Sequence, residues 1–269
     1  MRFFETFKQL AEGKNLDEII MLGYCYHNGI GTNVDKQKAF KLYEKAVHLE
    51  NNIAQINITI YWYKKFAKRG NQDAQFNLAK IYKNGDEIDK NINKAIYWYK
   101  KSAKRGYQYA QFNLAHIYYN GDGIDKNINK AIYWYEKSAE QGYQKAQFNL
   151  ALIYQNGDGI DKDIDRAIYW YEKSAEQSNR DAQFNLALIY NNGDGVGKDI
   201  DKAIYWYEKS AKQGNQDAQY NLAKIYKYGD GIDKDIDKAI YWYEKSAKQG
   251  HQKAQFILAL IYDYGQGYR

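Results

Sequence analysis

The sequence predicts an all-α solenoid, a stack of helix–loop–helix repeats, and two observations support this. Tryptophan recurs at a fixed interval of 36 residues, each time within the frame Tyr-Trp-Tyr-X-Lys-X-Ala. A fixed period of this length is typical of repeat proteins, whose units bury a continuous core only when they stack. The chain also has no proline, so no helix is interrupted by the proline mechanism. The repeating tryptophans are Trp62, Trp98, Trp134, Trp170, Trp206 and Trp242.

One unit, residues 74–109, shows how the pattern predicts two helices. Apolar residues from Ala74 to Tyr82 fall at helical spacing, and Gly85 is suited to a left-handed cap. Asp89 or Asn91 is a good N-cap for the second helix, whose core stripe extends from Ile92 to Ala103. The capping glycine recurs as Gly85, Gly121, Gly157, Gly193 and Gly229, which we expect to be structural.

The period divides the chain into consecutive units that form a single array. Full units cover 74–109, 110–145, 146–181, 182–217 and 218–253, and a half unit covers 254–269. Upstream lie a divergent unit at 18–53 and a unit at 54–73 that lacks 16 residues, preceded by an N-terminal cap at 1–17. The shortened unit has no first helix or glycine loop, so we expect a weak seam near residues 50–60.

The tryptophans lie at the edge of the predicted core stripe. Trp98, for example, is flanked by Ala95 and Ala103, small residues that allow helices to approach closely. We therefore expect the tryptophans to pack between neighbouring units, and a ligand-stacking role is the alternative. The single cysteine, Cys25, lies in an apolar helical pattern and is expected to be a buried free thiol.

Composition favours no enzyme and no cofactor. The four histidines share no metal spacing with each other or with Cys25, and no catalytic triad, phosphate loop or calcium loop is present. The net charge of +6 comes from interspersed charges, whereas a nucleic-acid-binding face would cluster Lys and Arg. The lone cysteine favours a reducing compartment, and no stretch is apolar enough to span a membrane. We expect a cytoplasmic protein without metal.

Two segments carry a family resemblance. The run from Leu114 to Ile124, with its Asn-Gly-Asp-Gly loop, and the run from Lys130 to Ala139 resemble the Sel-one-like repeat, a tetratricopeptide-like family. The resemblance covers residues 18–269 and implies a right-handed α/α superhelix that acts as an adaptor. The composition is similar to that of fungal arrays of this family. Departures from the family pattern are Leu42, Glu87, Ser178 and Gly197.

The resemblance also implies that the first helix of each unit lines the concave face. There the repeats form an asparagine column, and a side-chain amide can donate and accept hydrogen bonds to an extended peptide. The residue type varies along the two flanking columns. This variation fits either partner specificity or neutral sequence change at the surface. The predicted peptide-binding residues are Asn77, Asn113, Asn149, Asn185 and Asn221, with Lys80, His116, Leu152, Leu188 and Lys224, and with Tyr109 and Lys145.

These features predict a protein-interaction scaffold for signalling or complex assembly that holds a protein or extended peptide. Two alternatives stay open: an RNA-binding helical repeat that uses lysines and exposed tyrosines, and a degenerate array fragment without present function. The C-terminal half unit is expected to leave an apolar face uncovered, through which copies could self-associate.

Overall fold

The computed structural model describes residues 8, 16–47, 53–85 and 89–265, and over these residues it contains α-helices and no strand. Helices that follow one another in the chain pack together, which confirms the predicted all-α solenoid of helix pairs. The chain divides into two compact units, Met1–Trp134 and Tyr135–Arg269, with the boundary inside helix α8 (Ile128–Glu140). Each unit is described by itself.

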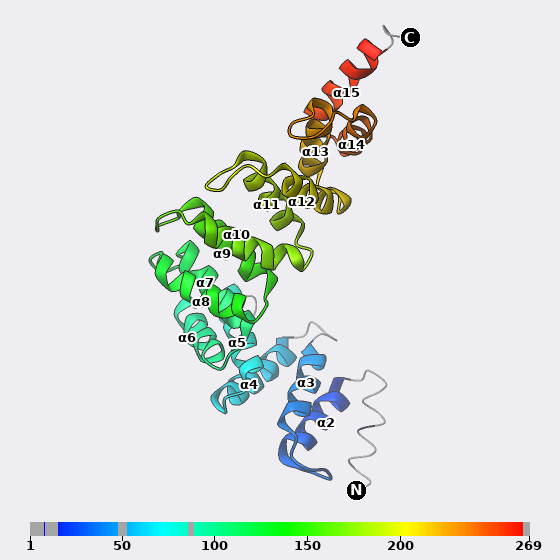
Figure 1. The fold of residues 1–269 in the computed structure, drawn as a ribbon. Helices are drawn as coiled ribbons and strands as arrows, with labels where there is room; N and C mark the ends of the chain where they lie inside the picture. The colour runs from blue at the N-terminus through cyan, green and yellow to red at the C-terminus, as the bar shows by residue number, and fades with distance from the viewer. Residues whose placement is uncertain (1–7, 9–15, 48–52, 86–88, 266–269) are drawn as a thin grey trace. The chain divides into compact units, whose positions relative to one another are not determined.

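The first unit begins with two helices that pack as a pair, followed by a longer single helix and then a regular pair (Figure 1). The second helix of this regular pair packs against the helix that follows it in the chain. In order, the helices are α2 (Leu16–Asn28), α3 (Lys36–Val47), α4 (Ile53–Lys68), α5 (Gln72–Asn84), α6 (Ile92–Ala103) and α7 (Gln108–Asn120).

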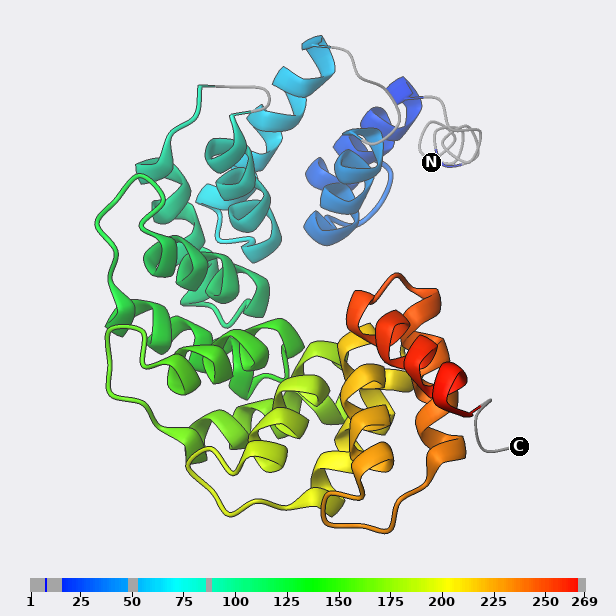
Figure 2. The same cartoon turned by 90° about the horizontal axis from the view of Figure 1, so that it is seen from above.

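In the second unit, each helix from Gln144 onward packs against the next helix in the chain (Figures 1 and 2). We call α5, α7, α9, α11, α13 and α15 the first helices, and α4, α6, α8, α10, α12 and α14 the second helices. Their bounds are α9 (Gln144–Asn156), α10 (Ile164–Glu176), α11 (Arg180–Asn192), α12 (Ile200–Lys212), α13 (Gln216–Tyr228), α14 (Ile236–Lys248) and α15 (Gln252–Gly265).

Local sequence explains where the helices begin and end. Asn91 caps α6 by accepting a hydrogen bond from the Lys94 N–H at 2.9 Å, as predicted. The five repeated glycines after the first helices all have a left-handed backbone, with φ between 66° and 77°. Ser178 stands where other repeats close with glycine, and its φ of 66° is the only positive value of a non-glycine among the described residues. Glu87 lies outside the described residues.

The core is centred on the tyrosine that follows each tryptophan. Tyr99, Tyr135, Tyr171, Tyr207 and Tyr243 are essentially fully buried. The tryptophans themselves lie closer to the surface: Trp98, Trp134 and Trp170 are half-buried, whereas Trp206 and Trp242 are buried. The neighbouring tyrosine on the outer side packs edge-on against each of these indole rings. The tyrosine that follows each tryptophan therefore fills more of the core than the tryptophan, which was expected at the edge of the core stripe.

Buried amide side chains join consecutive helices. A glutamine near the start of each first helix donates from Nε2 to the backbone carbonyl eight residues earlier, at the end of the preceding second helix. This satisfies one of the carbonyls that a helix C-terminus leaves without an intrahelical donor. The glutamines are Gln75, Gln111, Gln147, Gln183, Gln219 and Gln255, and all but the last are buried.

The shortened repeat has a different core. Trp62 of α4 stacks on Tyr43 of α3 with ring centroids 4.8 Å apart, and Phe66 is buried beside them. His27 at the end of α2 packs edge-on against Trp62 and Phe66. Residues 50–52 of the seam predicted near residues 50–60, and nearly all of the predicted N-terminal cap at 1–17, lie outside the described residues. The expected weakness of this seam stays a prediction.

Candidate functional site

Three hollows lie along the first helices of the second unit. The Lys224 hollow, about 620 Å³, lies between α11 and α13 and is lined by Leu188, Tyr207, Asn221, Lys224 and Tyr228, among others. Its size falls within the range of about 300–1,000 Å³ that is typical of ligand pockets. The hollow therefore includes residues from two of the three predicted columns.

The other two hollows lie nearer the starts of the first helices. The Phe148 hollow, about 490 Å³, is bordered by Phe148, Asp181, Phe184 and Asp217 from α9, α11 and α13. The Lys253 hollow, about 440 Å³, lies between α13 and α15 and shares Phe184 and Asp217 with it. The Phe148 and Lys253 hollows are therefore direct neighbours.

The asparagine column is partly engaged within the fold. Asn149, Asn185 and Asn221 donate from Nδ2 to the hydroxyls of Tyr135, Tyr171 and Tyr207, at 3.2, 3.0 and 3.4 Å. Each bond joins a first helix to the preceding second helix. The three amides therefore have a structural role in addition to the predicted one, and their carbonyl oxygens accept from no recorded donor within the described residues.

The other two asparagines of the column do not bond to a tyrosine hydroxyl. Asn77 donates to Glu44 Oε1 at 3.2 Å, and Asn113 donates to the Tyr109 carbonyl four residues earlier in α7. The hydroxyl of Tyr99, which corresponds to Tyr171 in the repeat, is buried without a partner. The hydroxyl of Tyr243 is also buried without a partner, since Ile257 occupies the asparagine position of its repeat.

The flanking columns differ in what their members contact. Lys80 lies over the ring of Phe76, and His116 accepts a hydrogen bond at Nδ1 from Asn120 Nδ2 at 2.7 Å. Leu152 is half-buried, and Lys145 is exposed. Four of the predicted peptide-binding residues line these hollows: Asn185, Leu188, Asn221 and Lys224. The other eight line none of the three: Asn77, Asn113, Asn149, Lys80, His116, Leu152, Tyr109 and Lys145.

Aromatic side chains that were not among the predicted site residues also border these hollows. Phe148, Phe184 and Tyr220 occupy one position of the repeat, two residues after its first alanine, and each is half-buried. They pack against the buried Tyr171, Tyr207 and Tyr243, respectively, at centroid distances of 5.8–6.0 Å. The recurrence of an aromatic residue at this position was the available signal.

Three buried tyrosines behind the hollows have shifted pKa values. Burial is the main reason that the pKa values of the Tyr171, Tyr207 and Tyr243 hydroxyls lie above their ordinary value. Burial likewise raises the pKa of the Cys25 thiol, which is buried and free as predicted. No group of three or more His, Cys, Asp or Glu side chains suited to a metal occurs within the described ranges. Nor does any helix there have the length and apolar character needed to cross a membrane.

A profile of the Sel1 repeat matches most of the chain, at residues 19–51, 55–71, 72–107, 108–143, 144–179, 180–215, 216–251 and 252–269. The chain belongs to the Sel1 repeat family. Its shortened repeat, matched at residues 55–71, is therefore a Sel1 repeat that lacks about half of its usual length. No curated protein sequence matches this Sel1 repeat chain.

Two solved Sel1 repeat structures are similar to the chain over nearly all of its length. One is c5321 from uropathogenic Escherichia coli strains, described as a protective antigen with an SLR fold, with 31% identity and a TM-score of 0.76 over 97% of this chain. The other is a Sel1 repeat protein from Oxalobacter formigenes, with 28% identity and a TM-score of 0.64, aligned over 96% of this chain and 79% of its own. The present chain spans 60% of the length of c5321.

The first helix of the C-terminal repeat, α15, has its own exposed apolar side chains. Phe256 is 66% exposed and Tyr262 is 48% exposed. Tyr262 also donates a hydrogen bond to Glu244 of α14 at 2.6 Å. Self-association of two copies through this end stays a prediction.

Proposed function

We propose that this Sel1 repeat chain is a non-enzymatic scaffold that binds an extended segment of a partner protein along its first helices. Sel1 repeat proteins are generally scaffolds for protein interactions. The observation that supports the binding face is the Lys224 hollow, because residues of two predicted columns, Leu188 with Lys224 and Asn221, line one concavity. A cytoplasmic setting and a role in complex assembly or signalling form part of this proposal.

The chemistry of the Lys224 hollow suits a peptide backbone. Asn191, Asn192 and Asn221 supply amide groups to its lining, while Leu188 and Ile225 supply apolar surface. Amides can donate to peptide carbonyls and accept from peptide N–H groups regardless of the partner's side chains. The variable column would then select side chains, since Leu188 favours an apolar residue and Lys224 an acidic one.

A charge-neutral exchange of two column residues tests this proposal. The double variant Leu188→Lys with Lys224→Leu keeps composition and net charge unchanged, and both residue types already occur in this column of the repeat. We expect it to fold like the wild type. Asn→Ala variants are less suitable, because Asn185 and Asn221 also bond to core tyrosines.

The readout is quantitative capture of proteins from cell extract, followed by affinity measurement for each captured protein. A set of proteins bound by the wild type and lost with the exchanged variant would support the proposal. Equal binding to both forms would show that the variation of residue type along this column is neutral and does not select a partner.

RNA binding is a second candidate with one observation in its favour. On the second helices, half-exposed tyrosines lie beneath lysine ammonium groups, as in Tyr205 with Lys209 at 4.5 Å and Tyr241 with Lys245 at 5.5 Å. Aromatic rings with nearby cations can stack nucleic-acid bases. Binding of an oligouridine that falls steeply with salt, through counterion release, would favour this candidate over the scaffold.

A further inference from the structure

The Phe148 hollow combines aromatic walls with carboxylates. Phe148 and Phe184 are each held from behind by a buried tyrosine, Tyr171 at 5.9 Å and Tyr207 at 6.0 Å between ring centroids. Because those tyrosines are essentially fully buried, each phenylalanine ring packs against the core on one side. Their half-buried state leaves part of each ring for contact with a bound group.

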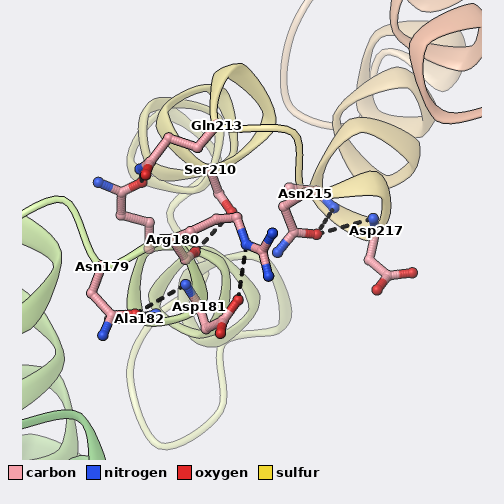
Figure 3. Close-up of polar contacts among 10 residues, drawn as sticks. Asn179, Arg180, Asp181, Ala182, Ser210, Gln213, Asn215 and Asp217 are labelled. Carbon is pink, nitrogen blue, oxygen red and sulfur yellow. Dashed lines mark hydrogen bonds and ion pairs between the residues drawn. The ribbon is translucent and has the colours of Figure 1, made fainter. Parts of the chain in front are cut away.

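The charged side chains that line this hollow are Arg180, Asp181 and Asp217, which leaves one carboxylate in excess. Arg180 Nε lies 3.1 Å from Asp181 Oδ1, so this pair is neutral as a unit. Figure 3 shows the Asp217 carboxylate well apart from the Arg180–Asp181 pair. The recorded ionic contact of Asp217 is with His251 Nε2 at 3.4 Å, on the side of the Lys253 hollow, and it is an ion pair only when the histidine is protonated.

We propose that the Phe148 hollow binds an arginine side chain of the partner segment, beside Asp217 and against Phe184. A guanidinium group can stack on an aromatic ring and at the same time bond to a carboxylate through its planar array of donors. Gln249 at the rim supplies a further acceptor, because its Nε2 donates to Gln219 at 2.7 Å and its carbonyl oxygen has no recorded donor within the described residues. This inference rests on the proposed function and specifies one side chain of the partner.

The position of Asp217 within the repeat supports a role beyond helix capping. It is the second residue of α13 and is exposed, and Asn215 already caps this helix by accepting from the N–H groups of Asp217 and Ala218. Asp237 is the second residue of α14 and is exposed as well, but it lines none of the three hollows. The two aspartates therefore make the same first-turn contribution to a helix and differ in their surroundings.

The test is an NMR titration of the isotopically labelled chain with N-acetyl-arginine N-methylamide, using the neutral citrulline analogue as the comparison probe. We expect the arginine probe to shift backbone amide signals near Phe184 and Asp217. Asp217→Asn should weaken its binding about three- to fivefold, the upper part of the range for one exposed charge pair. The matched control Asp237→Asn, with the same change in charge at the same helix position, should leave the affinity unchanged.

Several results would overturn the assignment: no shifts at this hollow, equal shifts from the citrulline analogue, or equal weakening by Asp217→Asn and Asp237→Asn. Failure here is distinguishable from failure of the proposed function. If the Leu188/Lys224 exchange abolishes partner binding while the arginine probe binds nowhere on the first helices, only the arginine assignment fails. If the probe binds but the exchange leaves partner binding unchanged, the proposed peptide-binding face is wrong.

Discussion

Removing one hydroxyl from the core should have opposite consequences at two equivalent tyrosines. The Tyr171 hydroxyl donates to Gln155 Oε1 at 2.6 Å and accepts from Asn185 Nδ2 at 3.0 Å. Tyr171→Phe keeps the buried ring and removes both bonds. Since a hydrogen bond contributes a net 0.5–1.5 kcal/mol, we expect a loss of about 1–3 kcal/mol. The Tyr99 hydroxyl is buried without a partner, so Tyr99→Phe should be neutral or stabilise by up to about 1 kcal/mol.

Local hydrogen exchange is the appropriate assay, because repeat arrays need not unfold in one step. A loss of about 2 kcal/mol corresponds to exchange roughly 30-fold faster. We expect this acceleration in the amides of α10 and α11 for Tyr171→Phe, with no acceleration in α6 and α7 for Tyr99→Phe. Equal effects of the two substitutions would show that the hydrogen bonds of Tyr171 do not stabilise the array, since the ring is retained in both and only the hydrogen bonds differ.

Three further predictions concern backbone strain, pH and the shortened repeat. Ser178→Gly should stabilise the chain by about 0.5–1 kcal/mol, measured by thermal unfolding, because the left-handed backbone at φ 66° favours glycine; a lower melting temperature would contradict this. Burial, aided by Arg69, Lys65 and Lys36, lowers the pKa of His27, so the folded state binds this proton less readily than the unfolded state. The stabilisation that the contacts of neutral His27 provide should be complete above its ordinary pKa of about 6.5 and should fall as the pH drops below that value. A His27→Gln variant that shows the same acid-induced change in melting temperature as the wild type would disprove this. Hydrogen exchange in α2 and α3 should be faster than in α9 to α14, and uniform protection would argue against a weak seam.

The repeat architecture could be predicted because its signals are local. The 36-residue period, the glycine after each first helix and the asparagine or aspartate before each second helix depend on a few adjacent residues. Gly85 and Asn91 have the predicted backbone and capping roles for this reason. The burial of Cys25 could be predicted as well, because helical spacing alone places it among apolar neighbours, and the structure confirms it.

The site could be predicted only in part, because its contacts join different helices. Asn185 was expected to face a partner, yet its amide donates to Tyr171, 14 residues earlier, and this pairing depends on how the two helices are aligned. The hollows depend on the spacing between first helices, which no local pattern specifies. Phe184 and Asp217 were therefore not recognised as neighbours, although each occupies a regular position of the repeat.

The most direct test of the proposed binding face is site-specific photo-cross-linking. A benzophenone amino acid is introduced at position 188, on α11 in the Lys224 hollow, or at position 205, on the exposed surface of α12. Each form is irradiated with a partner protein captured by the wild-type chain. We expect a cross-linked complex from position 188 and none from position 205. A complex formed only from position 205 would show that the partner binds the second helices and not the first.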